Sequence, residues 1–98
     1  MGRLKEGTVT LVTGAGRGVG REIAITFARE GSDMVLAARS EEDLRSTADI
    51  IESLGRRVLM IPTDISDVTQ VEALANQVYR EFEYVDTLIA NSGVGGPV

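Results

Sequence analysis

A glycine-rich turn separates an apolar, β-branched run from a segment with helical periodicity. Residues 8–13 read TVTLVT, and residues 13–20 read TGAGRGVG. The first run is typical of a buried strand, and glycines let an anion approach the backbone without meeting a Cβ. A helix that begins in such a turn offers unpaired N–H groups and the positive end of its dipole. The turn therefore predicts a phosphate-binding loop, with Gly14, Gly18 and Gly20 as its main glycines.

The rest of the chain repeats this alternation of apolar runs and amphipathic segments. The pattern predicts four strands, at residues 8–13, 34–38, 58–61 and 85–90, with Pro62 ending the third. Three helices are expected between them: one from Gly18 to Gly31, one from a cap at Ser40 to Gly55, and one from a cap at Ser66 or Asp67 to Phe82.

Each predicted helix carries an apolar stripe that is expected to face a sheet. The acidic residues of the second helix lie mostly off its stripe and are interpreted as solvated surface without a function. The stripes comprise Gly20, Ile23, Ala24, Phe27, Ala28 and Gly31; Leu44, Ala48, Ile51 and Leu54; and Val71, Leu74, Ala75, Val78 and Phe82. The acids are Glu41, Glu42, Asp43, Asp49 and Glu52.

Strands that alternate with helices predict a parallel sheet, and right-handed crossovers give it the strand order 3-2-1-4. The expected fold class is α/β, a Rossmann-type three-layer αβα arrangement that forms one partial domain over residues 1–98. Its fourth strand has an open edge beside an apolar face, which predicts self-association or completion by further chain.

Composition excludes several kinds of function. The chain has no cysteine and no histidine, which removes disulfides, thiol nucleophiles, histidine acid/base chemistry and the common zinc sites. Its net charge of −5 disfavours nucleic acid as a partner. It has no apolar run long enough for a membrane span and no apolar signal core, so a cytoplasmic location is expected.

Three motifs together resemble the short-chain dehydrogenase/reductase family. The turn has the spacing T-G-x-x-x-G-x-G, whereas the common G-x-G-x-x-G fails because Val19 occupies the last slot. Residues 63–65 (TDI) follow the third strand, and residues 90–93 (ANSG) end the fourth, where the family has N-N-A-G. Asn91 and Gly93 match that segment, and residues 90 and 92 depart from it.

The resemblance implies roles for individual residues. Gly14, Gly18, Val19 and Gly20 would bind the cofactor in the turn. Asp64 would accept a hydrogen bond from the adenine amino group, with the backbone of Ile65 alongside. Asn91 and Gly93 would brace the sheet near the cofactor ribose. Taken alone, Asp64 also fits a turn residue that hydrogen-bonds its own backbone.

The end of the second strand indicates which nicotinamide dinucleotide is bound. An acid there would hydrogen-bond the ribose hydroxyls of NAD, but this chain has Ala38 followed by Arg39. Arg39 can bind a 2′-phosphate through charge-assisted hydrogen bonds, and Arg17 can approach the same phosphate from the turn. NADP(H) is therefore favoured over NAD(H), although both arginines also fit ordinary solvated surface.

The family's hydride-transfer chemistry uses a Ser and a Tyr-x-x-x-Lys motif beyond the fourth strand. The chain's tyrosines do not supply it, because Glu83 follows Tyr79 by four residues and Leu88 follows Tyr84 by four. No catalytic residue is therefore predicted, and the chain alone is expected to be inactive. The resemblance covers about the first two-fifths of a typical member, 3-oxoacyl-acyl-carrier-protein reductases among them, and the substrate is unassigned.

Two other interpretations remain. One is a truncated, non-catalytic module for nucleotide binding or assembly. The other, an S-adenosylmethionine enzyme, is disfavoured because that cofactor also needs an acid for its ribose hydroxyls, where Ala38 and Arg39 stand. A P-loop is disfavoured because no Lys-Ser or Lys-Thr pair follows the glycines.

Overall fold

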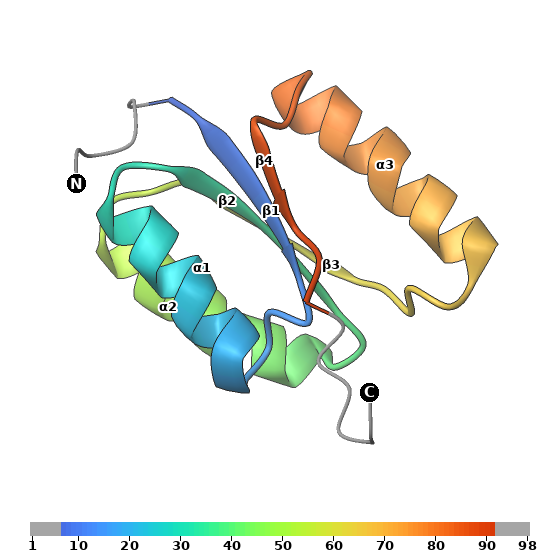
Figure 1. Ribbon diagram of the computed structural model, residues 1–98, viewed down its shortest axis with the longest axis horizontal. Helices are drawn as coiled ribbons and strands as arrows, with labels where there is room; N and C mark the ends of the chain where they lie inside the picture. The colour runs from blue at the N-terminus through green and yellow to red at the C-terminus, as the bar shows by residue number, and fades with distance from the viewer. Residues whose placement is uncertain (1–6, 92–98) are drawn as a thin grey trace.

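The computed structural model describes residues 7–91. Strands and helices alternate along this range (Figure 1). All four strands are parallel and lie in the order β3-β2-β1-β4, which confirms the predicted fold class and strand order. In chain order the elements are β1 (Val9–Thr13), α1 (Gly18–Arg29), β2 (Asp33–Ala38), α2 (Glu41–Ser53), β3 (Val58–Pro62), α3 (Val68–Phe82) and β4 (Thr87–Ile89).

The helices form two layers, with α1 and α2 on one face of the sheet and α3 on the other (Figure 1). The central strands are apolar on both faces, as is usual for a parallel sheet covered on both sides. Alternate side chains of one strand therefore enter two separate cores. The core under α1 and α2 includes Val12, Met34, Leu36, Leu44 and Ile51, and the core under α3 includes Val35, Ala37, Leu74, Val78 and Phe82.

The helix ends follow the predicted capping signals. The Ser40 hydroxyl accepts a hydrogen bond from the N–H of Asp43 at 3.1 Å, and the Asp67 carboxylate caps α3. Gly31 and Gly55 follow α1 and α2 with φ angles of 109° and 83°. Only glycine adopts this region without strain, so each residue lets the chain leave its helix and enter the next strand.

β4 is shorter than the sequence predicts, since it spans Thr87–Ile89 rather than residues 85–90. It pairs only with β1. Just before β4, Asp86 makes two hydrogen bonds with Val9 of β1. Its N–H donates to the Val9 carbonyl at 2.9 Å, and its side-chain Oδ2 accepts from the Val9 N–H at 2.7 Å. The Val9 N–H thus bonds a side chain, where the longer predicted strand would have offered a backbone carbonyl.

Two details at element ends also differ from expectation. Leu54 is 40% exposed rather than facing the sheet, because α2 ends at Ser53 and Leu54 is its C-cap. The third strand was expected to end at residue 61, before Pro62. In the structure Pro62 is the last residue of β3 and pairs with Ala38. Its missing N–H is not needed there, because the Ala38 carbonyl accepts from the next N–H, that of Thr63, at 2.7 Å.

An open apolar groove runs between α3, Leu11 of β1 and the turn that precedes β4. Val71 and Leu11 contribute to its lining, as do Tyr79, Tyr84 and Val85. Val71, predicted to face the sheet, is 37% exposed here. The expectation that self-association or further chain covers this face stays a prediction.

Candidate functional site

The carboxyl ends of the four parallel strands lie at one edge of the sheet, and the candidate residues gather there. Gly14, Arg39, Thr63 and Ala90 each follow a strand directly. Ligands of open α/β sheets bind outside this edge. The strand order places β1 beside β4, so the glycine-rich turn lies next to Asn91.

The N-terminus of α1 begins without a side-chain cap. Arg17 is its N-cap residue, whereas α2 and α3 are both capped by side chains. Within residues 7–91, the N–H groups of residues 16–20 have no hydrogen-bond partner. Gly18 has φ 63°, and a Cβ added there would meet nothing within 4 Å. A set of free donors beside open space is what a phosphate group requires.

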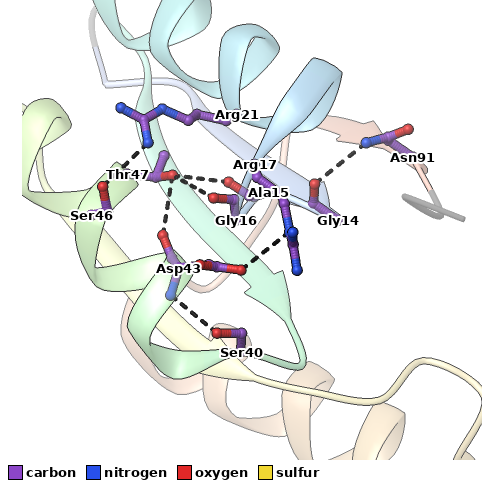
Figure 2. Close-up of polar contacts among 10 residues, drawn as sticks. All are labelled: Gly14, Ala15, Gly16, Arg17, Arg21, Ser40, Asp43, Ser46, Thr47 and Asn91. Carbon is purple, nitrogen blue, oxygen red and sulfur yellow. Dashed lines mark hydrogen bonds and ion pairs between the residues drawn. The ribbon is translucent and has the colours of Figure 1, made fainter. Parts of the chain in front are cut away.

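Gly14, Gly20 and Asn91 form the packing contact that holds this turn against the sheet. The Asn91 side-chain N–H₂ donates to the Gly14 carbonyl at 3.4 Å (Figure 2). The Asn91 carbonyl accepts from the Thr13 hydroxyl at 3.1 Å. A Cβ on Gly20 would overlap the Gly14 carbonyl oxygen and lie 2.5 Å from the Asn91 nitrogen. Packing within the protein therefore requires glycine at position 20. Contact between Gly20 and a cofactor stays a prediction.

The other side of the turn packs against the first turn of α2. Arg17 Nε forms an ion pair with Asp43 Oδ2 at 3.3 Å, with an Arg17 side chain that is 86% exposed (Figure 2). A Cβ on Gly16 would lie only 2.7 Å from the Asp43 Cβ. Asp43 therefore contacts the turn, which its interpretation as solvated helix surface did not include.

Thr47 links α2 to the turn, and sequence reasoning missed it. The side chain is fully buried, and its hydroxyl lies 3.1 Å from the Ala15 carbonyl and 3.4 Å from the Gly16 carbonyl (Figure 2). The signal was present in the helical pattern, because Thr47 falls three residues after Leu44 and four before Ile51. A polar residue inside an apolar stripe requires a buried hydrogen-bond partner.

Asp64 is held in a turn after β3 and has a pKa below its ordinary value of 3.8. Its Oδ1 accepts from the hydroxyl and the N–H of Ser66, at 2.7 and 3.0 Å, and both bonds stabilise the charged form. The nearby Arg39 charge lowers the pKa further. Within the part of the chain that the structure describes, Asp64 Oδ2 makes no hydrogen bond, so it is available to a ligand.

Removal of the Ser66 hydroxyl is expected to raise the Asp64 pKa toward 3.8. Because the folded pKa is depressed, the stabilisation from this turn is present above the unfolded pKa and is lost as the pH falls through the folded pKa. Carboxyl ¹³C NMR titration of the Ser66→Ala variant measures the change. Ser53→Ala, which removes a hydroxyl that bonds within α2, is the control; an Asp64 pKa that is unaltered in Ser66→Ala would contradict the assignment.

The remaining predicted site residues have fewer contacts. Val19 and Ile65 are 68% and 45% exposed at the same edge. Arg39 is also exposed. Gly93 lies outside the described residues.

Residues 7–91 contain neither a candidate membrane span nor a candidate metal cluster. No helix in residues 7–91 combines the length and apolar character needed to cross a bilayer. The same residues contain no group of three or more acidic, histidine or cysteine side chains that could hold a metal ion.

Known proteins resemble the chain in sequence. The family model described as short chain dehydrogenase matches residues 8–98. The 7α-hydroxysteroid dehydrogenase of Escherichia coli is 36% identical over 92 residues, which cover 94% of this chain and 36% of that protein. The EphD protein of Mycobacterium tuberculosis is 40% identical over 88 residues, which cover 90% of this chain and 15% of that protein. The chain thus spans well under half the length of these relatives.

Solved structures share the fold over nearly the whole chain. A hydroxysteroid dehydrogenase from E. coli superposes with a TM-score of 0.90 at 37% identity, covering 97% of this chain and 40% of that one. A carveol dehydrogenase from Mycobacterium avium, in complex with NAD, gives 0.89 at 29% identity, with coverage of 99% and 39%. A metagenomic short-chain oxidoreductase in complex with NADP gives 0.86 at 35% identity, with coverage of 95% and 43%. The chain belongs to the short-chain dehydrogenase/reductase family, and its fold is the cofactor-binding, Rossmann-type half of that family's domain.

Proposed function

We propose that this chain binds NADP(H) at the carboxyl edge of its sheet, as the cofactor-binding part of an oxidoreductase that acts on a carbonyl or alcohol. The observation that carries the proposal is the run of five N–H groups, residues 16–20, without partners in the described structure. They lie at the positive end of α1 beside the open space at Gly18. When bound, the nicotinamide ring supplies hydride transfer.

The phosphate-bearing part of the cofactor fits the N-terminus of α1. Donors that are already fixed in place and lack partners gain charge-assisted hydrogen bonds from an anion without having to break others. The absence of a side-chain cap at Arg17 supports this role, because a capping oxygen would occupy the same donors. Val19, exposed on the first turn of the helix, would face the bound dinucleotide.

The choice of NADP(H) over NAD(H) depends on the end of β2. Structural neighbours include one bound to NAD and one bound to NADP, so the family alone does not decide between the two. Ala38 leaves no carboxylate to repel a 2′-phosphate, and Arg39 follows it with an exposed guanidinium. Arg17 contacts Asp43 through Nε, and its two terminal nitrogens would bind the same phosphate.

The adenine end fits the turn after β3. Asp64 Oδ2 is available to accept from the adenine amino group, while Oδ1 is fixed by Ser66. The exposed Ile65 offers apolar surface to the ring. Asn91 would act indirectly, by holding the Gly14 carbonyl and with it the start of the turn. Gly93 would lie beside the ribose, as the family resemblance implies.

Calorimetric titration with NADPH, NADH and S-adenosylmethionine tests the proposal. NADPH is expected to bind about tenfold or more tightly than NADH, since the 2′-phosphate adds at least one charge-assisted hydrogen bond of about 1.5 kcal/mol. S-adenosylmethionine should show no binding. Equal affinity for the two dinucleotides would overturn the preference for NADP(H), and binding of neither would overturn the proposed function.

A further inference from the structure

We infer that Thr47 is a positioning residue for the phosphate site, because its buried hydroxyl fixes the peptide groups whose N–H ends face the cofactor. This inference rests on the proposed function and adds a residue outside the glycine-rich motif. Thr47 lies on α2, 31 and 32 positions along the chain from the carbonyls it reaches. Its side chain is fully buried, so it would act through the turn rather than by direct contact with the cofactor.

The hydrogen bond determines which way the turn's peptides point. A threonine hydroxyl has one proton and donates one full hydrogen bond. The shortest distance from Thr47 Oγ1 is 3.1 Å to the Ala15 carbonyl, compared with 3.4 Å to both Gly16 and Asp43 carbonyls. Helical threonines commonly bond only the carbonyl four residues earlier, here that of Asp43. The closer partner on the turn shows that Thr47 serves a tertiary contact.

Peptide geometry carries this orientation to the opposite side of the turn. The peptide unit is planar and trans, so its C=O and the following N–H point in opposite directions. The Ala15 carbonyl points at α2, and the N–H of Gly16 in the same plane therefore points away from α2. Gly16 and Arg17 share the next plane, where the Gly16 carbonyl also faces Thr47. Thr47 thus directs the first two unpaired N–H groups of the turn outward.

Packing leaves little alternative to this arrangement. The Thr47 side chain and Ala15 are both fully buried, so bulk water does not reach the hydrogen bond between them. Without the hydroxyl, the Ala15 carbonyl would be buried and unsatisfied unless its peptide rotated, and the Gly16 carbonyl would lose its weaker contact. Such a rotation would turn the attached N–H groups away from the cofactor.

Substitution of Thr47 by valine, which keeps the shape and removes the hydroxyl, tests the inference. NADPH affinity is expected to fall about tenfold, the loss of one charge-assisted hydrogen bond. The affinity for adenosine, which has the ring and ribose but no phosphate, should change less than about twofold. A chain that had simply lost structure would lose both ligands in parallel. Thr47→Ser, which restores the hydroxyl, should recover NADPH affinity.

Thr10→Val is the matched control. Thr10 is equally buried, and its hydroxyl bonds Ser32 at 2.8 Å at the opposite end of the sheet, so NADPH affinity should be unaffected. Equal NADPH binding by Thr47→Val and the unsubstituted chain would overturn the inference and leave the proposed function standing. Parallel loss of adenosine and NADPH would also overturn it. Failure of the unsubstituted chain to bind NADPH would overturn both.

Discussion

Replacement of Gly20 by alanine is expected to lower the free energy of unfolding by about 3 kcal/mol and to weaken NADPH binding about tenfold. The added Cβ would overlap the Gly14 carbonyl oxygen, which is backbone and cannot swing aside, and would crowd the Asn91 side chain. Alanine is favoured over glycine within a helix by about 1 kcal/mol, but the overlap exceeds this gain. The first turn of α1 must shift, and its N–H groups shift with it.

Urea denaturation and calorimetry measure the two effects of Gly20→Ala. Glu22→Ala is the control, because Glu22 lies on the same helix with an exposed side chain, and its change should stay within about 0.5 kcal/mol. A Gly20→Ala chain as stable as the unsubstituted one would show that α1 does not approach the turn as closely as the structure places it.

Replacement of Arg39 by alanine is expected to raise the Kd for NADPH about 10- to 100-fold, which corresponds to about 1.5–3 kcal/mol. The Kd for NADH should change less than about threefold, because NADH has no 2′-phosphate for the guanidinium to bind. Arg39 is exposed, directly follows β2, and lies close enough to Asp64 to lower its pKa. Its charge is thus at the edge where the adenosine end is proposed to bind.

Arg45→Ala separates this local contact from the general effect of removing a positive charge. Arg45 is an exposed arginine of α2, and in residues 7–91 it makes no ion pair. It should leave both dinucleotide affinities within about twofold. If Arg39→Ala weakened NADPH and NADH equally, the arginine would act on the shared part of the cofactor and the selectivity would need another source.

The fold was predictable because each element carries a local pattern. Apolar β-branched runs gave the strands, and Ser40, Asp67, Gly31 and Gly55 marked helix ends through capping chemistry that acts within a few residues. The length of β4 was not predictable, because the Asp86 side chain accepts from the Val9 N–H of the neighbouring strand β1. That contact joins residues 77 positions apart.

The candidate site was predictable to the extent that its residues lie in one motif. Gly14 and Gly18 have the positive φ angles that a tight turn requires. The sequence did not reveal that packing requires a glycine at position 20. The close contacts of Gly20 are with Gly14 and Asn91, which the strand order brings together. The contacts of Asp43 and Thr47 with the turn were not predicted. Both residues lie on α2, and their partners in the turn are 26 to 32 positions earlier in the chain.

The most direct test of NADP(H) binding at the carboxyl edge is titration of the ¹⁵N-labelled chain with NADPH, followed by amide NMR. The proposed site predicts shifts in the N–H resonances of residues 16–20, Arg39, Asp64 and Ile65, with little change along the outer face of α3. Shifts confined to the apolar groove between α3, Leu11 and the turn before β4, or no shifts at millimolar NADPH, would contradict it.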